Sequence, residues 1–221
     1  MRHRSILTTL VAATCIAAPL HAQSAQRWSI QASGLYVGVF GDAYKGLDNG
    51  FGGELQVRVT PSLWSYGAGV QTSSHGLKGA SGSSISLNGV FIEPRRVLDV
   101  GSAKYAPYVS ARAAYLQQSA DIGSGNSLSA SGFQGNVGGG VLTKLSPRVN
   151  LDLGITLGVI QFGDVTVKRG GSTVGTFSGT SGTGQNVVVR AGLAIGLGGG
   201  AKKAPAPVPA SKPATKPAVK R

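Results

Sequence analysis

The clearest pattern in this chain is a strict alternation of residue character over positions 148–162. Large apolar residues stand at every second position, namely Val149, Leu151, Leu153, Ile155, Leu157 and Val159. Polar residues and glycines lie between them, and this period of two predicts a β-strand with one fully apolar face. A soluble strand usually has about 5–6 residues, whereas a tilted strand needs about 9–11 to cross a bilayer. The segment therefore has the length and the apolar face of a membrane-spanning strand.

The same alternation recurs along the chain and predicts eight strands. They cover residues 27–40, 51–60, 63–73, 84–94, 104–117, 131–145, 148–162 and 185–198. In the first of them the phase of the alternation changes around Ser33. Such a change predicts a β-bulge at that point, because one extra residue turns the following side chains to the other face.

The connections between these strands differ in length in a regular way. Residues 60–62 and 146–147 form tight turns that contain proline, and residues 95–103 form an intermediate connection. The other connections are long and rich in Gly, Ser and Asn: 41–50, 74–83, 118–130 and 163–184. Short turns on one rim and long loops on the other are typical of an outer-membrane barrel with its short turns in the periplasm. The predicted fold is an all-β, eight-stranded antiparallel up-and-down transmembrane β-barrel.

The aromatic residues lie mainly near the ends of the predicted strands. One group lies near the short-turn ends: Trp28, Trp64, Tyr66, Phe91, Tyr105 and Tyr108. A second group lies near the long-loop ends: Phe40, Phe51, Tyr115, Phe133 and Phe162. Tyr36 is the main ambiguity, since it lies in the middle of a strand. A transmembrane barrel is expected to carry one belt of aromatic residues at each of its two membrane interfaces.

The polar face of the strands carries small residues and a few charges of both signs. An eight-stranded barrel has an interior just wide enough for side chains to fill, and a charge excluded from water must be paired. We therefore predict a charge network in the lumen, formed by Glu54, Arg58, Arg112, Lys144, Asp152 and Arg190. In particular, Asp152 needs a cation such as one of the three arginines. The alternative is a soluble secreted barrel or sandwich with its apolar face inside.

Both ends of the chain differ from its body. Residues 1–22 begin with a basic segment, continue with an apolar stretch and end in small residues, which predicts a cleaved secretory signal peptide. Residues 201–221 consist mainly of Lys, Pro and Ala and predict a disordered tail. The β-barrel domain is therefore expected over 23–200. Because Cys15 is the only cysteine and lies in the signal peptide, we expect no disulfide and no thiolate metal site. No other metal site and no cofactor are predicted.

The net charge of +13 is concentrated in part of the chain. The tail holds six of the 21 basic residues, and the barrel region has a net charge of only +5 once all 8 acidic residues are counted there. About 12% of residues 23–200 are charged, against about 25% in a typical soluble domain. The basic residues do not alternate with aromatics on one face, so nucleic acid is not an expected partner.

Three segments resemble the small eight-stranded outer-membrane β-barrel family of Gram-negative bacteria, the OmpA/OmpX type. They are GGELQVRVTPSLWSYGAGVQ (52–71), GGGVLTKLSPRVNLDLGITLGV (138–159) and the last strand. The resemblance implies a monomer in the outer membrane, in contact with its lipid and lipopolysaccharide. It also implies contact with the barrel-assembly machinery through a signal in the last strand, formed by Arg190, Gly192, Ile195 and Leu197. The chain departs from the family pattern in lacking a terminal aromatic residue.

Such barrels host several functions, so the architecture alone does not define one. We expect a structural or surface-interaction role and no enzymatic activity. The segments 165–169 and 172–177 predict a hairpin above the membrane, which is the best contact surface. A narrow pore for small solutes is the alternative, and a lipid-modifying enzyme that uses His75 with Ser73, Ser74 or Ser81 is a second one. His75 is expected to be a solvated loop residue, because no carboxylate lies nearby in sequence to orient it. The basic tail is a candidate for binding peptidoglycan by charge.

Overall fold

The computed structural model describes residues 27–123, 126–169, 172–177 and 182–197. Nine β-strands and one short 3-10 helix, η1 (Asp42–Tyr44), form within these ranges. The strands are β1 (Trp28–Phe40), β2 (Leu47–Val59), β3 (Trp64–Leu77), β4 (Ala80–Val97), β5 (Tyr105–Gly123), β6 (Asn126–Lys144), β7 (Val149–Arg169), β8 (Ser172–Phe177) and β9 (Thr183–Leu197).

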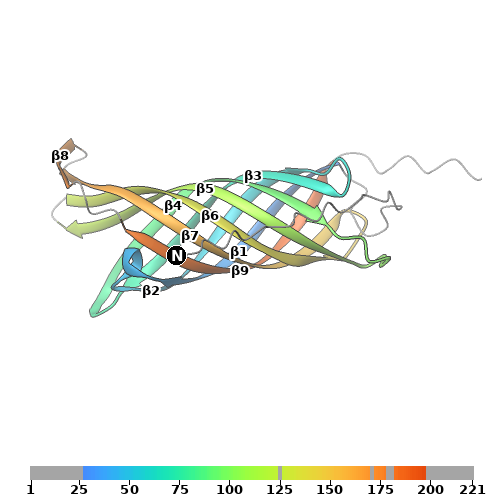
Figure 1. Ribbon diagram of the computed structural model, residues 1–221, viewed down its shortest axis with the longest axis horizontal. Helices are drawn as coiled ribbons and strands as arrows, with labels where there is room; N and C mark the ends of the chain where they lie inside the picture. The colour runs from blue at the N-terminus through green and yellow to red at the C-terminus, as the bar shows by residue number, and fades with distance from the viewer. Residues whose placement is uncertain (1–26, 124–125, 170–171, 178–181, 198–221) are drawn as a thin grey trace, which may run out of the picture.

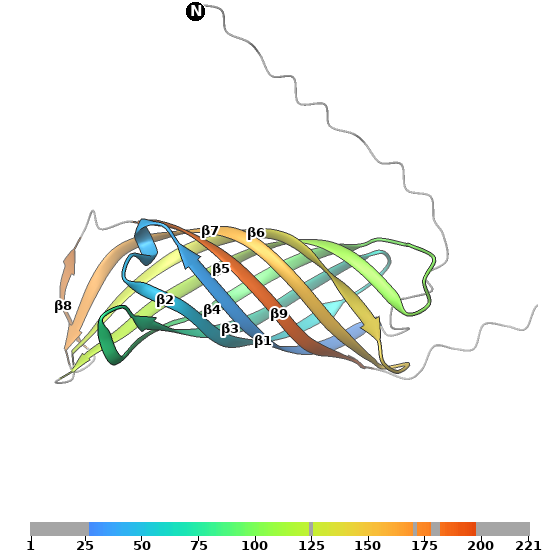
Figure 2. The ribbon, with the colours of Figure 1, turned by 90° about the horizontal axis from the view of Figure 1, so that it is seen from below.

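Eight of the strands close into a ring. β1 pairs with both β2 and β9, and β6 pairs with both β5 and β7, always antiparallel. Within the described part of the chain, β8 pairs with β7 alone and lies outside the ring. The strands are strongly inclined to the long axis (Figures 1 and 2), as closure of an eight-stranded barrel requires. The predicted eight-stranded up-and-down barrel is confirmed.

The strands extend further toward the long-loop end than predicted. β4 begins at Ala80, β5 continues to Gly123 and β6 begins at Asn126, so much of 74–83 and 118–130 is strand. Ser, Gly and Asn there resemble loop residues, but pairing with the neighbouring strand satisfies their backbone groups. The predicted hairpin between 165–169 and 172–177 is confirmed as the outer part of β7 paired with β8. Figure 1 shows β8 projecting beyond one end of the barrel.

The β-bulge predicted at Ser33 is wrong. The register of β1 is continuous with both neighbours across this position. Gln31 and Ser33 point into the barrel, and so do Leu35 and Val37, which are buried. The side chains of β1 therefore alternate between the two faces without interruption. What changes at Ser33 is the character of the inward residues, which are polar before this point and apolar after it.

The outer surface of the ring is apolar, as the alternation in 148–162 predicts. Leu153, Ile155, Leu157 and Val159 are each about half exposed, while Asp152 between the apolar positions is fully buried. Soluble monomers rarely expose continuous apolar patches above a few hundred square ångströms. This surface requires lipid, and the alternative with the apolar face inside is excluded.

Most of the aromatic residues form the expected pairs on the outside. Tyr36 and Phe51 lie 5.3 Å apart between ring centroids, and Tyr115 and Phe133 lie 5.1 Å apart. Both pairs belong to the long-loop side, which resolves the ambiguity at Tyr36. Three residues predicted to lie in the two belts of aromatic residues were placed wrongly. Nearness to a strand end indicates how deep a residue lies in the membrane, but it does not indicate whether the side chain points inward or outward. All three residues are buried inside the barrel: Phe91, Tyr108 and Phe162.

The interior has two halves of different chemistry. Toward the long loops lies an apolar half, whose buried residues include Leu35, Leu87, Leu116, Ile160 and Phe162. Toward the short turns the inward positions of the same strands are mainly polar or charged. The predicted signal peptide and tail lie outside the described residues. No helix in the described ranges is long and apolar enough to cross a membrane.

Candidate functional site

A layer of charged side chains crosses the lumen in its middle and its short-turn half. Seven charged residues of the described chain form it, all less than 9% exposed. We call them the charged layer: Glu54 and Arg58 on β2, Glu93 and Arg95 on β4, Arg112 on β5, Asp152 on β7 and Arg190 on β9. With four arginines and three carboxylates, the layer has one excess positive charge.

Glu93 is the centre of this layer. Its carboxylate accepts hydrogen bonds from Arg95 Nε at 2.9 Å and Arg112 Nη2 at 2.7 Å. Arg190 donates to it from Nη1 at 3.1 Å and Nη2 at 3.2 Å. Arg58 Nη1 lies 3.7 Å from its Oε2. One carboxylate on β4 therefore holds four guanidinium groups from four strands, and charge-assisted bonds of this kind are among the strongest in proteins.

Asp152 is the second anchor of the layer. It accepts hydrogen bonds from Gln31 Nε2 at 2.6 Å, Arg95 Nη1 at 2.8 Å and the Tyr108 hydroxyl at 2.7 Å. Arg190 Nε lies 3.6 Å from its Oδ2. The main cation partner of Asp152 is thus Arg95, which the sequence analysis did not include, and Arg190 is a secondary one.

Glu54 completes the layer from the β2 side. Its Oε2 accepts a hydrogen bond of 2.7 Å from Arg112 Nη1, and its Oε1 accepts one of 3.3 Å from Arg190 Nη1. Arg58 on the same strand donates to the Gln56 side-chain carbonyl at 2.9 Å and to the Glu93 backbone carbonyl at 3.0 Å. Every charged group of the layer therefore has partners, as burial demands.

Two aromatic rings and two glycines give the layer its shape. The guanidinium of Arg95 lies 4.4 Å from the centre of the Tyr108 ring, and that of Arg112 lies 3.9 Å from the centre of the Phe91 ring. A Cβ at Gly140 or Gly154 would come within 2.6 Å of the Tyr108 hydroxyl. These glycines therefore leave the space in which Tyr108 reaches Asp152.

The charged layer leaves little open space in the lumen. A cavity of about 20 Å³ adjoins it on the long-loop side, lined by Arg112, Gln134 and Asn136 among others. A cavity of about 30 Å³ adjoins it on the short-turn side, lined by Arg58 and Arg95. Cavities of this size hold one or two water molecules. Both cavities are too small for a solute larger than a few water molecules.

The structure brings together five of the six residues predicted for the charge network, and leaves out one. Lys144 is half-buried at the last position of β6, where it faces Asn150 in the register of β7, and takes part in none of the ion pairs of the charged layer. Glu93 and Arg95 also belong to the charged layer but not to the network predicted from the sequence. Arg95 was assigned to a connection, whereas β4 continues to Val97. The signal was available, since Glu93, Arg95 and Val97 continue the alternation set by Phe91.

The residues of the predicted assembly signal lie on β9 with different orientations. Arg190 points into the charged layer and is buried, whereas Ile195 and Leu197 are exposed on the lipid-facing side. A Cβ at Gly192 would overlap with Ser33 of β1, so this glycine permits close approach of β9 to β1. Recognition by the assembly machinery stays a prediction.

His75 is not a solvated loop residue, contrary to expectation. It lies in β3 and is fully buried. Its Nδ1 lies 3.1 Å from the Asp48 backbone carbonyl, and its Nε2 lies 3.1 Å from the Ser73 hydroxyl. A carbonyl partner places the proton on Nδ1 and leaves Nε2 as the acceptor for Ser73. The pair resembles a hydrolase dyad, and both side chains are buried on the inward face of β3. In the described residues, no three His, Cys, Asp or Glu side chains lie close enough to hold a metal ion.

Comparison with solved structures identifies the class of this fold. Neisserial surface protein A is similar over 77% of this chain and 97% of its own, with 17% identity and a TM-score of 0.59. The outer-membrane protein OprG of Pseudomonas aeruginosa is similar over 82% of this chain and 100% of its own, with 14% identity and a TM-score of 0.52. A major outer-membrane protein of Thermus thermophilus matches with 15% identity and a TM-score of 0.52, over 77% of this chain and 98% of its own.

The chain therefore has the fold of the small outer-membrane β-barrels, the class to which the OmpA/OmpX-type resemblance pointed. At these identities the likeness defines the fold alone. No family model matches the sequence, and no curated protein matches it.

Proposed function

We propose that this protein is an exported, non-enzymatic outer-membrane barrel whose lumen is closed and which acts through a sheet that projects from the cell surface. The outer parts of β5, β6 and β7 together with β8 form this projecting sheet. Figure 2 shows it extending past η1, which covers the same end of the barrel. The long-loop end faces outward, since short turns lie in the periplasm in barrels of this class.

The observation that carries the proposal is the exposed apolar surface of β8, the last strand in the order of the projecting sheet. This strand has β7 as its neighbour on one side, and in the described part of the chain no strand pairs with its other side. Two large apolar side chains of β8, Val174 and Phe177, are about 60% exposed. Edge strands attract further strands, and proteins usually protect them. An extended peptide segment of a partner can add to β8 and place its side chains against Val174 and Phe177.

A peptide-display selection tests this surface role. The full-length protein in lipid nanodiscs is used to select binders from a random peptide library, with empty nanodiscs as the background. We expect enriched peptides with alternating apolar residues. Binding to the double variant Val174→Glu/Phe177→Glu should be weaker by about tenfold or more, a change of ~1.4 kcal/mol.

A matched control places the same two charges at the opposite rim. Leu98 and Val100 are also exposed apolar residues, and they follow β4 at the short-turn end. The variant Leu98→Glu/Val100→Glu should bind the selected peptides as the wild type does. Equal loss in both variants, or no enrichment over empty nanodiscs, would contradict the proposal.

The narrow pore is the alternative function, and the charged layer argues against it. We expect no steady ionic current when the purified protein is inserted into a planar bilayer. A reproducible single-channel conductance that disappears on substitution of Arg190 would favour the pore.

The basic tail lies outside the described residues, and its binding to peptidoglycan remains a proposal. Co-sedimentation of the 201–221 deletion variant with cell-wall sacculi would test it.

A further inference from the structure

The apolar half of the lumen opens into a cavity at the long-loop end. Its volume is about 420 Å³, which lies in the range of small-molecule sites, about 300–1,000 Å³. The wall comes from β4, β5, β6 and β7, with η1 and Gly182 on the other side. It is more than ten times larger than the cavities beside the charged layer.

The wall of this cavity is mainly apolar. Its apolar side chains are Ile85, Ala120, Leu128, Ala130, Phe162 and Val165. Phe162, Ile85 and Ala130 also belong to the buried apolar half beneath the cavity, so the wall continues the core. Polar residues occupy the inward positions of the same strands nearer the short turns. A cavity that held only water would be lined by residues of that kind. Apolar walls around a hollow instead favour an apolar occupant.

One irregularity of the backbone makes room for the cavity. The register between β6 and β7 shifts between Ala130 and Gly132, where β7 has one more residue than β6. Gly163 lies at this shift and lines the cavity. Bulges of this kind widen or bend a barrel locally and are often found near binding sites.

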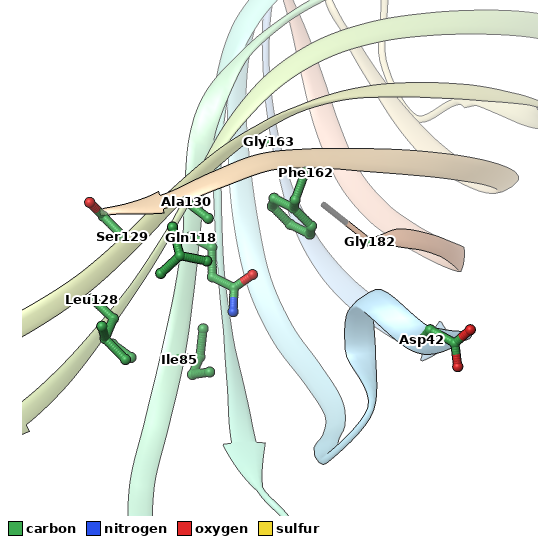
Figure 3. A pocket seen from close by; sticks show the side chains of 11 residues that line it. Asp42, Ile85, Gln118, Leu128, Ser129, Ala130, Phe162, Gly163 and Gly182 are labelled. Atoms are coloured by element: carbon green, nitrogen blue, oxygen red, sulfur yellow. The ribbon is translucent and has the colours of Figure 1, made fainter. Parts of the chain in front are cut away.

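The polar groups of the cavity favour an uncharged ligand. Figure 3 shows the Gln118 amide directed into the same space as Ile85 and Phe162. Ser129 adds a hydroxyl group to the lining. Among the described residues that line the cavity, Asp42 on η1 is charged and none is basic. A carboxylate or phosphate group would therefore find no counter-charge among these residues.

The cavity ends blindly inside the barrel. Tyr44 and Phe162 meet edge to face at a centroid distance of 6.0 Å, and Tyr44 is buried. Below them the next cavity holds about 20 Å³, and below that lies the charged layer. A molecule that enters from outside is therefore retained at the mouth and has no path across the membrane.

We propose that this cavity is a binding site for a small, uncharged, largely apolar molecule that carries one hydrogen-bonding group. The apolar body packs against Phe162, Ile85 and Leu128, and the polar group pairs with the Gln118 amide. This site is separate from the projecting sheet at β8, so it stands independently of the proposed surface role.

Three water-soluble probes of matched size test this site: cyclohexanol, cyclohexanecarboxylate and cyclohexylammonium. Binding to the full-length protein in nanodiscs is measured by saturation-transfer NMR, with empty nanodiscs subtracted. Cyclohexanol should bind most tightly and the carboxylate most weakly. Gln118→Leu should weaken cyclohexanol binding by about two- to tenfold, the range for loss of one neutral hydrogen bond. Equal binding of all three probes, or a signal equal to that of empty nanodiscs, would overturn the proposal.

A cavity-filling variant gives the sharper result. Ala130→Phe places a ring in the cavity and should abolish cyclohexanol binding, whereas Ala113→Phe on the lipid-facing side of β5 should leave it unchanged. Gel migration before and after heating establishes that each variant is folded. If Ala130→Phe does not fold, Val165→Phe fills the same cavity from β7. Undiminished binding in a folded cavity-filling variant would refute the site. The Val174→Glu/Phe177→Glu variant should retain cyclohexanol binding, which separates this result from failure of the surface role.

Discussion

The two halves of the lumen are filled by side chains of opposite chemistry. In the charged layer, seven charged side chains fill the space and pair with one another through short bonds centred on Glu93 and Asp152. In the apolar half, residues such as Leu116 and Ile160 fill it as in a soluble core. Both halves are built from the same strands. Side chains must fill a barrel interior of this width. The inward side chains of one strand can nevertheless be charged in one half of the lumen and apolar in the other.

The difference predicts how each half responds to loss of one side chain. The charged layer depends on every partner, because removing one leaves opposite charges buried without compensation. The apolar half loses contacts in proportion to the volume removed. The following substitutions test this contrast, all measured as free energies of unfolding by urea in lipid vesicles.

Glu93→Gln should have the largest effect. It removes the charge that four arginines share, and we expect a loss of about 3–5 kcal/mol, the usual result of breaking a buried ion pair. Asp99→Asn, an exposed acidic residue at the short-turn rim, is the control and should change little. A stability of Glu93→Gln equal to that of the control would mean that Glu93 is not the centre of the charged layer.

Ile160→Ala tests the apolar half. Ile160 is fully buried inside the barrel, so the substitution leaves a cavity and should cost about 2–5 kcal/mol. Ile155→Ala is the matched control on the same strand, since Ile155 faces outward and lipid can occupy the space left. If the outward substitution costs more, the apolar half does not behave as a packed core.

Tyr108→Phe removes a single hydroxyl from the charged layer and leaves its charges in place. Asp152 loses a hydrogen bond of 2.7 Å, and Arg190 Nη2 loses one of 2.9 Å. The expected loss is about 1–3 kcal/mol, the cost of a buried polar group left without a partner. Tyr105→Phe, at an exposed position of the same strand, should be neutral, and an equal effect of the two substitutions would contradict this role of Tyr108.

Lys144→Ala should have the smallest effect. Lys144 lies at the end of β6 outside the ion pairs of the charged layer, so we expect a change within about 0.5 kcal/mol, as for ordinary surface positions. Arg190→Ala provides the comparison and should be far more destabilising. A large loss in Lys144→Ala would restore this residue to the network predicted from the sequence.

Much of the barrel could be predicted because its signal is local. The alternation in 148–162 identified β7 and its lipid-facing side, and the proline-containing turns separated neighbouring strands. The errors also have local causes. At Ser33 the pattern changed because the lumen changes chemistry, which a single strand does not reveal. For Phe162 and Tyr108, the distance from the strand end was used to predict a position at the membrane interface. The alternation, which indicates whether a side chain points inward or outward, was not used.

The charge network was harder to predict, because its members are far apart in sequence. Arg190 and Glu54 are 136 positions apart, and Gln31 and Asp152 are 121 apart. The number of inward charges can be counted from the alternation, as it was for Glu54 and Arg112. Their pairing depends on the tilt of the strands and on the register around the ring. For this reason Asp152 was expected to pair with one of three arginines, whereas its shortest ion pair is with Arg95.

By itself, the sequence determined the number of strands in the ring, the lipid-facing side of β7 and the need for paired charges inside. These follow from a period of two and from the cost of burying charge, which act over a few residues. Only the tertiary structure decided that Glu93 lies at the centre of the charged layer, that Lys144 lies outside the layer and that the apolar half opens into a cavity at the long-loop end. The reason is that closure of the ring brings inward positions of different strands to the same height, and this register exists only once all eight strands are paired.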